Sequence, residues 1–108
     1  MVEIDEDGRL DVRRFDFYVG ICIHYDGKKT LTSVSGFREG VSYEWMLNFM
    51  KGFLRCRGNV VDHKVLGKII LLQGDWSKDV QNLLVNHHHA ERDQVYVTEL
   101  YNRIDMSG

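Results

Sequence analysis

A long alternating segment, FDFYVGICIHYDGKKTLTSVSG (residues 15–36), opens the part of the chain that has the pattern of a fold. Apolar and aromatic residues occupy every second position from Phe15 to Tyr25, and a period of two over this length predicts a β-strand. Asp26-Gly27 then predicts a hairpin turn, because both residues tolerate a positive φ at low cost. The run 30–35 is rich in Thr, Leu and Val and predicts the returning strand, so two adjacent lysines would lie at the hairpin tip.

A first amphipathic helix follows the hairpin. Ser42 is a candidate N-cap, and Glu44 is favourably placed in the first turn. We expect the helix to stop at Arg57-Gly58. Its apolar side chains recur at helical spacing and form one predicted inward stripe: Met46, Phe49, Met50 and Phe53.

The second half of the chain repeats this alternation of strands and helix. Residues 59–62 predict a short strand, 63–67 a loop, and 68–73 a strand that is apolar on both faces and therefore belongs in the sheet interior. Asp75 is a candidate N-cap for a second helix. Residues 94–100 predict the last strand. The inward stripe of the second helix would comprise Trp76, Val80, Leu83 and Leu84.

The order β-β-α-β-β-α-β predicts an α+β fold, a two-layer sandwich with about five strands and two helices on one face of the sheet. A chain of 108 residues with 44% hydrophobic residues is most simply one domain. We expect a disordered acidic tail over 1–12, a folded domain over 13–101 and a C-terminal extension over 102–108. The sequence contains no internal repeat.

The net charge of −2 is unevenly distributed. The tail has five acidic residues and one arginine, so the body is mildly basic, which permits nucleic-acid binding without requiring it. Cys22 and Cys56 lack metal-ligand spacing and predict free thiols in a reducing compartment. With no signal peptide and no apolar run of membrane-spanning length, we expect a cytoplasmic protein that is not bound to a membrane.

Catalytic signatures are missing from the sequence. No P-loop, G-x-G-x-x-G, G-x-S-x-G or H-E-x-x-H motif is present, so we expect neither an enzyme nor a cofactor. The triplet His87-His88-His89 favours a solvated helix end over a metal site, because consecutive helical residues point in different directions. Trp45 and Trp76 could stack on nucleobases, although core packing is favoured for Trp76.

Cationic side chains gather at the predicted loops and at one helix end. Lysines at a hairpin tip often serve only to keep the sheet edge soluble, whereas projecting cations on a rigid hairpin suit a phosphate backbone. The cationic side chains alone leave both interpretations open. The side chains in question are Lys28 and Lys29 at the first tip, Lys51, Arg55 and Arg57 near the end of the first helix, and His63, Lys64 and Lys68 around the second tip.

Four short motifs occur in one order and spacing: GKKTLTSVSGF (27–37), CRG (56–58), VVDH (60–63) and LQGD (72–75). Together they resemble the eukaryotic translation initiation factor 1 family, as a divergent member, and the similarity runs from about Val19 to Leu100. The first-hairpin motif and the QGD turn before the second helix are specific together, and the long second hairpin with His63 and Gly67 favours the eukaryotic initiation factor over relatives that share the fold.

The resemblance implies a monomer that binds the small ribosomal subunit and its RNA near the P site, promotes scanning and enforces start-codon selection. It also implies work beside the initiator tRNA and with initiation factors 2, 3 and 5. The resemblance matches Asp26, Gly27, Lys28 and Lys29 to the family's RNA-contacting hairpin tip, and the cations Lys51, Arg55 and Arg57 complete the expected RNA-binding set. The second hairpin tip, facing the tRNA, would be His63, Lys64, Val65, Leu66 and Gly67.

Three features depart from the family's pattern, and one of them is that the chain continues past the last predicted strand. The first helix, YEWMLNFMKGF, has one lysine where the family's helix is lysine-rich. The second tip carries Lys64 where the family usually has proline and an acidic residue. The lysine-poor first helix and the acidic tail motivate an alternative function, a protein-interaction adaptor that keeps the fold but binds ribosomes weakly.

Overall fold

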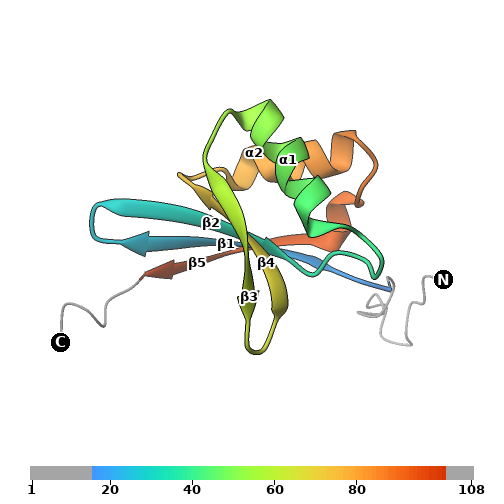
Figure 1. Ribbon diagram of the computed structural model, residues 1–108. Helices are drawn as coiled ribbons and strands as arrows, with labels where there is room; N and C mark the ends of the chain where they lie inside the picture. Colours follow the sequence, from blue (N-terminus) through green and yellow to red (C-terminus); the bar gives the residue numbers. More distant parts are fainter. Residues whose placement is uncertain (1–15, 102–108) are drawn as a thin grey trace, which may run out of the picture.

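The alternating segment forms an antiparallel hairpin in the computed structural model, which describes residues 16–101 (Figure 1). Strand β1 (Val19–Asp26) pairs with β2 (Lys29–Ser35). The strand begins later than predicted: Phe15 lies outside the described residues, and Phe17 packs beside the core before β1 starts. The backbone carbonyl of Phe17 accepts a hydrogen bond from the Gln94 side chain, at 3.2 Å, instead of continuing a ladder.

Helix α1 (Tyr43–Leu54) begins as predicted and ends earlier than predicted. The Ser42 hydroxyl accepts a hydrogen bond from the backbone N–H of Trp45 at 3.1 Å, which confirms the N-cap. The helix ends because Arg55 adopts a left-handed conformation, φ 54°, and donates its N–H to the Lys51 carbonyl. The predicted stop at Arg57-Gly58 is therefore wrong, since Gly58 already pairs in the next strand.

The second half contains β3 (Gly58–His63), β4 (Gly67–Gln73), α2 (Ser77–Asn86), a 3₁₀ turn (Arg92–Gln94) and β5 (Val95–Tyr101). Asp75 is not the N-cap of α2, because Trp76 occupies that position. The Asp75 carboxylate instead accepts hydrogen bonds from the N–H and hydroxyl of Ser77.

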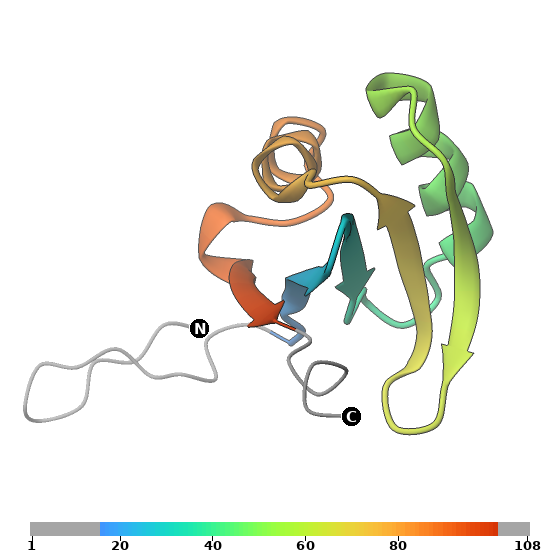
Figure 2. The same cartoon turned by 90° about the vertical axis from the view of Figure 1, so that its left-hand side faces the viewer.

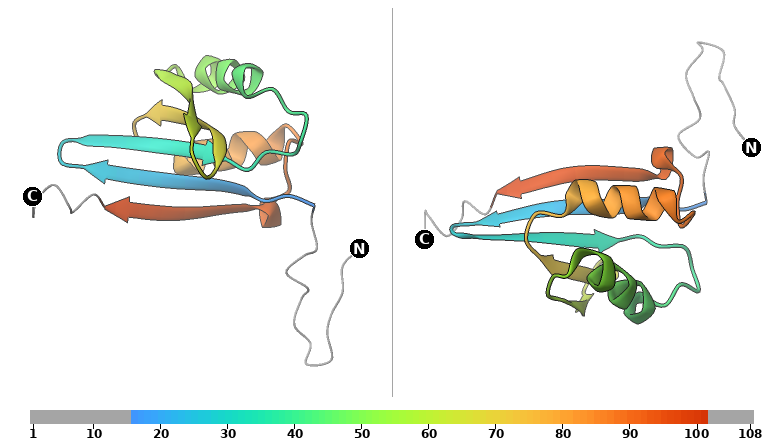
Figure 3. Two further views of the ribbon diagram at one scale, coloured as in Figure 1. Left: turned by 60° about the horizontal axis from the view of Figure 1, so that its bottom comes forward. Right: turned by 90° about the horizontal axis from the view of Figure 1, so that it is seen from above.

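The strands form one mixed sheet in the order β3-β4-β2-β1-β5. All neighbouring pairs are antiparallel except β1 and β5, which are parallel. Both helices lie over the same face of the sheet, and the β3–β4 hairpin is strongly rotated relative to β1 and β2 (Figures 2 and 3). The predicted α+β fold, its element order and the interior position of β4 are confirmed.

The core lies between the sheet and the helices. Met46 and Met50 of α1 and Val80 and Leu84 of α2 are buried against sheet residues. The sheet side of this core comprises Val19, Ile21, Val34, Ile70, Leu72 and Val95. Cys22 and Cys56 are free thiols. Among the described helices, none is long and apolar enough to span a bilayer. The predicted tail and C-terminal extension lie outside the described residues.

Candidate nucleic-acid interface

The first hairpin tip is a two-residue loop. Asp26 pairs with Lys29 as the last rung of the ladder, which leaves Gly27 and Lys28 as the loop. Only Gly27 has a positive φ, 61°, so Asp26 is a strand residue and the prediction of a turn at Asp26-Gly27 is one position early. A glycine at the first loop position favours a type II′ turn, whose twist matches the flanking strands. The four residues 26–29 are exposed, and the tip reaches beyond the rest of the sheet (Figure 1).

The second hairpin tip projects in a different direction from the first (Figures 1 and 2). His63 pairs with Gly67, so Lys64, Val65 and Leu66 form a three-residue loop, and Gly67 has φ 80°. The His63 ring nitrogen Nδ1 accepts hydrogen bonds from the N–H groups of Val65, at 3.0 Å, and Leu66, at 3.1 Å. His63 thus holds the loop in shape, a role that its sequence position did not suggest.

The loop leaves two apolar side chains in solvent: Val65 is 84% exposed and Leu66 is 59% exposed. Neither side chain contributes to the core. A tip that presents aliphatic bulk together with one cation, Lys64, can act by shape as well as by charge.

The three cations near the end of α1 belong to different backbone segments. Lys51 lies half-buried in the last turn, and Arg55 is exposed at the left-handed C-cap. The backbone of Arg57 is linked to the first hairpin through the end of β4. The Arg57 carbonyl accepts a hydrogen bond from the Gln73 N–H, and Gly74, which follows Gln73, donates its N–H to the Thr30 carbonyl. These two 2.8 Å bonds connect the segment before β3 to the start of β2.

One further predicted cation is paired within the protein. The Lys68 ammonium lies 3.3 Å from the Glu44 carboxylate, so this ion pair connects β4 to α1. The Glu44 pKa lies below its usual value because of a backbone hydrogen bond and, second, the Lys68 contact. Lys68 is therefore less available to a phosphate than Lys28 or Lys29.

Aromatic and histidine rings meet between α1 and the end of α2, a cluster that the sequence analysis did not identify. Trp45 stacks on Phe49, with ring centroids 5.4 Å apart and an interplanar angle of 9°. Phe49 also meets Phe53, His87 and His89 edge-on. Trp45 is 54% exposed and Phe53 is 56% exposed, so the predicted inward position of Phe53 is wrong. We call the side chains of Trp45, Phe49, Phe53, His87 and His89 the ring cluster.

The histidine triplet is divided by its backbone geometry. His87 caps α2, and His88 has a left-handed φ of 63°. His89 contacts Trp45 and Phe49, and its pKa lies below the usual value because burial disfavours the imidazolium, with smaller effects from His87, Arg38 and His88. Among residues 16–101, no group of three or more His, Cys, Asp or Glu side chains is placed to hold a metal ion.

Trp76 has a structural role, as the sequence favoured. Its indole Nε1–H donates to the Gln73 carbonyl at 2.6 Å, and the ring packs against the core. Trp45, in contrast, lies at the surface within the ring cluster. The only tryptophan of the described residues that is more than half exposed is thus on α1.

Comparison with known proteins shows which family this chain is similar to. A family model described as translation initiation factor SUI1 matches residues 22–90, which contain both hairpin tips and both helices. A protein translation factor SUI1 homolog of Spuriopimpinella brachycarpa is 42% identical over 81 residues, covering 74% of this chain and 72% of the relative. Similar proteins of Zea mays and Arabidopsis thaliana are each 36% identical over 81 residues and 74% of this chain, covering 70% and 72% of their own lengths.

Proposed function

The chain belongs to the translation initiation factor SUI1 family, and on this premise we propose that it binds the small ribosomal subunit near the P site. Bound there, it promotes scanning and enforces start-codon selection by occupancy and steric control, without bond chemistry. The observation that carries this proposal is the first hairpin tip, which presents Lys28 in a two-residue turn and Lys29 beside it on the last rung of the ladder.

A rigid tip suits binding to ribosomal RNA. The ladder between β1 and β2 extends to the pair Asp26 and Lys29, so the backbone of the tip is ordered before any RNA arrives. Binding then requires ordering of the lysine side chains alone, which keeps the entropic penalty of association small. Each ammonium that meets a phosphate releases condensed counterions, which gives affinity that decreases as salt increases. Arg57, near the start of β2, is a further candidate for the same RNA surface.

The second hairpin supports a steric role toward initiator tRNA. The exposed loop Lys64-Val65-Leu66 is held by His63, so it can resist displacement as a preformed shape. A cation there attracts tRNA phosphates rather than repelling them. We therefore propose that steric exclusion by Val65 and Leu66 dominates the opposition to tRNA in this chain.

The proposed setting is cytoplasmic. The chain would act as a monomer together with initiation factors 2, 3 and 5. Family membership supports partners in the translation machinery, and the individual factors are part of the proposal.

One observation favours the alternative function, a protein-interaction adaptor with weakened ribosome binding. The outer face of α1 presents the half-exposed rings of Trp45 and Phe53 in place of lysines. Exposed aromatic side chains are typical anchors of protein interfaces.

Cosedimentation of the full chain with purified small ribosomal subunits, at several salt concentrations, tests the proposal. We expect binding at low salt and a steep loss of affinity as salt increases. If the chain is instead a protein-interaction adaptor, we expect weak binding to the small subunits, with an affinity that changes little with salt. Absence of binding at low salt would overturn the proposed function.

A further inference from the structure

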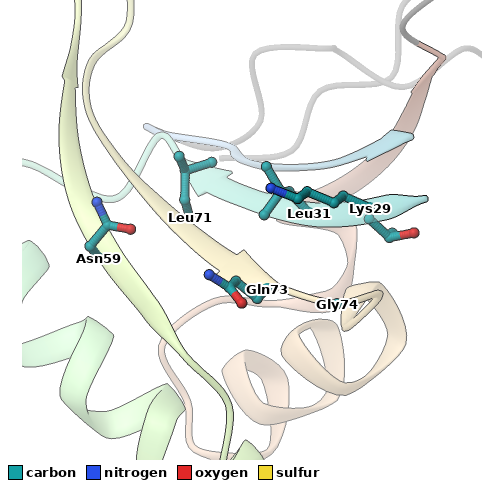
Figure 4. A pocket seen from close by; sticks show the side chains of 7 residues that line it. Lys29, Leu31, Asn59, Leu71, Gln73 and Gly74 are labelled. Atoms are coloured by element: carbon teal, nitrogen blue, oxygen red, sulfur yellow. The ribbon is translucent and has the colours of Figure 1, made fainter. Parts of the chain in front are cut away.

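The sheet face turned away from the helices carries a groove of about 590 Å³ (Figure 4). Leu31 pairs with Gln73, Asn59 pairs with Leu71, and Lys29 lies two positions before Leu31, so the side chains of these five residues point to the same side of the sheet. The neighbouring positions Val34, Ile70 and Leu72 alternate with them and face the core. The groove is therefore separate from the core and begins where the first hairpin tip ends.

The groove has an apolar floor and a polar rim. Leu31 and Leu71 are half-buried, whereas Asn59 and Gln73 are exposed. Within the described part of the chain, no hydrogen bond joins the side-chain amide of Asn59 or Gln73 to another group of the protein. Each amide thus offers one acceptor and one NH₂ donor to a ligand.

This arrangement fits an unpaired nucleobase. The aliphatic side chains of Leu31 and Leu71 can pack against a base, and Asn and Gln pair with the adenine edge through its N6 donor and N7 acceptor. The volume is within the range of about 300–1,000 Å³ that is typical of small-molecule sites. Lys29 belongs both to the tip and to the groove, so an RNA strand bound at the tip lies within reach of the groove.

We propose that the groove binds one unpaired adenine nucleotide of RNA. The base lies against Leu31 and Leu71, the amides of Asn59 and Gln73 bind its edge, and the Lys29 ammonium binds its phosphate. This inference rests on the proposed ribosome binding and adds to it a contact that distinguishes bases, which the lysines of the tip cannot provide.

Fluorescence anisotropy of three labelled RNA heptamers tests the groove at low salt. One is UUUAUUU, the second has an abasic residue in place of the central adenosine, and the third is all uridine. We expect the adenosine heptamer to bind about tenfold more tightly than the abasic heptamer, with the uridine heptamer between them. The double variant Asn59→Ala plus Gln73→Ala should bind the adenosine and uridine heptamers with nearly equal affinity, because the amides that distinguish the bases are missing.

The matched control is Asn82→Ala, which removes an exposed amide from α2 and should keep the preference of the parent. Circular dichroism of each variant checks that it is folded. Methyl shifts of Leu31 and Leu71 on titration with UUUAUUU should identify the groove as the binding place.

Equal affinity for the adenosine and abasic heptamers, or no binding of UUUAUUU, would overturn the groove assignment. An unchanged preference in the double variant would do so as well. Cosedimentation with small subunits is measured in parallel, and its loss in the parent chain at low salt overturns the proposed function itself. Normal cosedimentation together with no base preference would overturn only the assignment of the groove as a nucleotide site.

Discussion

Thr32 of β2 and Trp76, the residue before α2, are 44 positions apart in sequence and are joined by a hydrogen bond of 2.9 Å from the Trp76 N–H to the Thr32 hydroxyl. The same hydroxyl donates to the Gly74 carbonyl at 2.6 Å. Thr32 is fully buried. One side chain thus satisfies a donor and an acceptor of the turn that connects β4 to α2, and it fixes that turn against the centre of the sheet.

We expect Thr32→Val to lower the free energy of unfolding by about 1–3 kcal/mol, because both groups of the turn lose their hydrogen-bond partner. Thr32→Ser keeps the hydroxyl and is the matched control, with a smaller loss from the missing methyl group. Urea unfolding of the three proteins measures both values. A Thr32→Val protein as stable as the serine variant would show that water replaces the hydroxyl.

Two glycines with similar φ angles should respond differently to substitution by alanine. Gly36 has φ 89° and Gly40 has φ 93°, but a Cβ at Gly36 would collide with the backbone carbonyl of Tyr18, whereas a Cβ at Gly40 meets open space. Gly40→Ala should destabilise by about 1 kcal/mol from the left-handed conformation alone. Gly36→Ala adds a clash with backbone and should destabilise by about 3 kcal/mol. Equal losses in thermal or urea unfolding would contradict this difference.

The strands and turns were predictable because their signals are local. Alternation identified β1, and an Asp-Gly pair placed the first tip to within one residue. Helix α1 was harder, since its sequence is apolar on more than one side. Met46 and Met50 face the core together with Tyr43, Leu47 and Leu54, and this leaves Phe53 outside. Periodicity alone could not choose between this stripe and the predicted one, which contained Phe49 and Phe53.

The candidate site was predictable only in part, for a similar reason. The tip lysines follow from the hairpin signal. The spacing of four between Trp45, Phe49 and Phe53 could have indicated an aromatic surface, but their meeting with His87 and His89 depends on how α2 packs. The groove depends on β2 and β4 being neighbours, although 31 and 71 are distant in sequence. No local pattern specifies either juxtaposition.

Stability should decrease in mild acid because of His89. Its folded-state pKa lies below the ordinary value of 6.5, mainly through burial, so the unfolded chain takes up this proton at a higher pH than the folded chain does. The stabilising contribution is present above pH 6.5 and is lost as the pH falls through the lower folded-state pKa. We expect His89→Gln to reduce the decrease in melting temperature between about pH 7.5 and pH 5. Parallel curves for parent and variant would show that other groups cause the decrease.

The last prediction concerns Lys28 and Lys29. Both are exposed on the preformed tip, so Lys28→Ala plus Lys29→Ala should change the free energy of unfolding by no more than about 0.5 kcal/mol. Binding to small ribosomal subunits should weaken, and the slope of log K against log salt should decrease by about one unit per lost phosphate contact. In a reconstituted system, we expect more initiation at near-cognate codons, because a weakly held factor leaves early.

Lys78→Ala is the matched control, since it removes an exposed lysine from α2. Removal of a positive charge anywhere lowers general attraction to RNA slightly, whereas only a lysine in contact with a phosphate changes the salt slope by a whole unit. The control should therefore keep the slope and the codon preference of the parent. If the double variant binds like Lys78→Ala at every salt concentration, the tip is only a solvated turn, and the RNA-facing surface of this protein lies elsewhere.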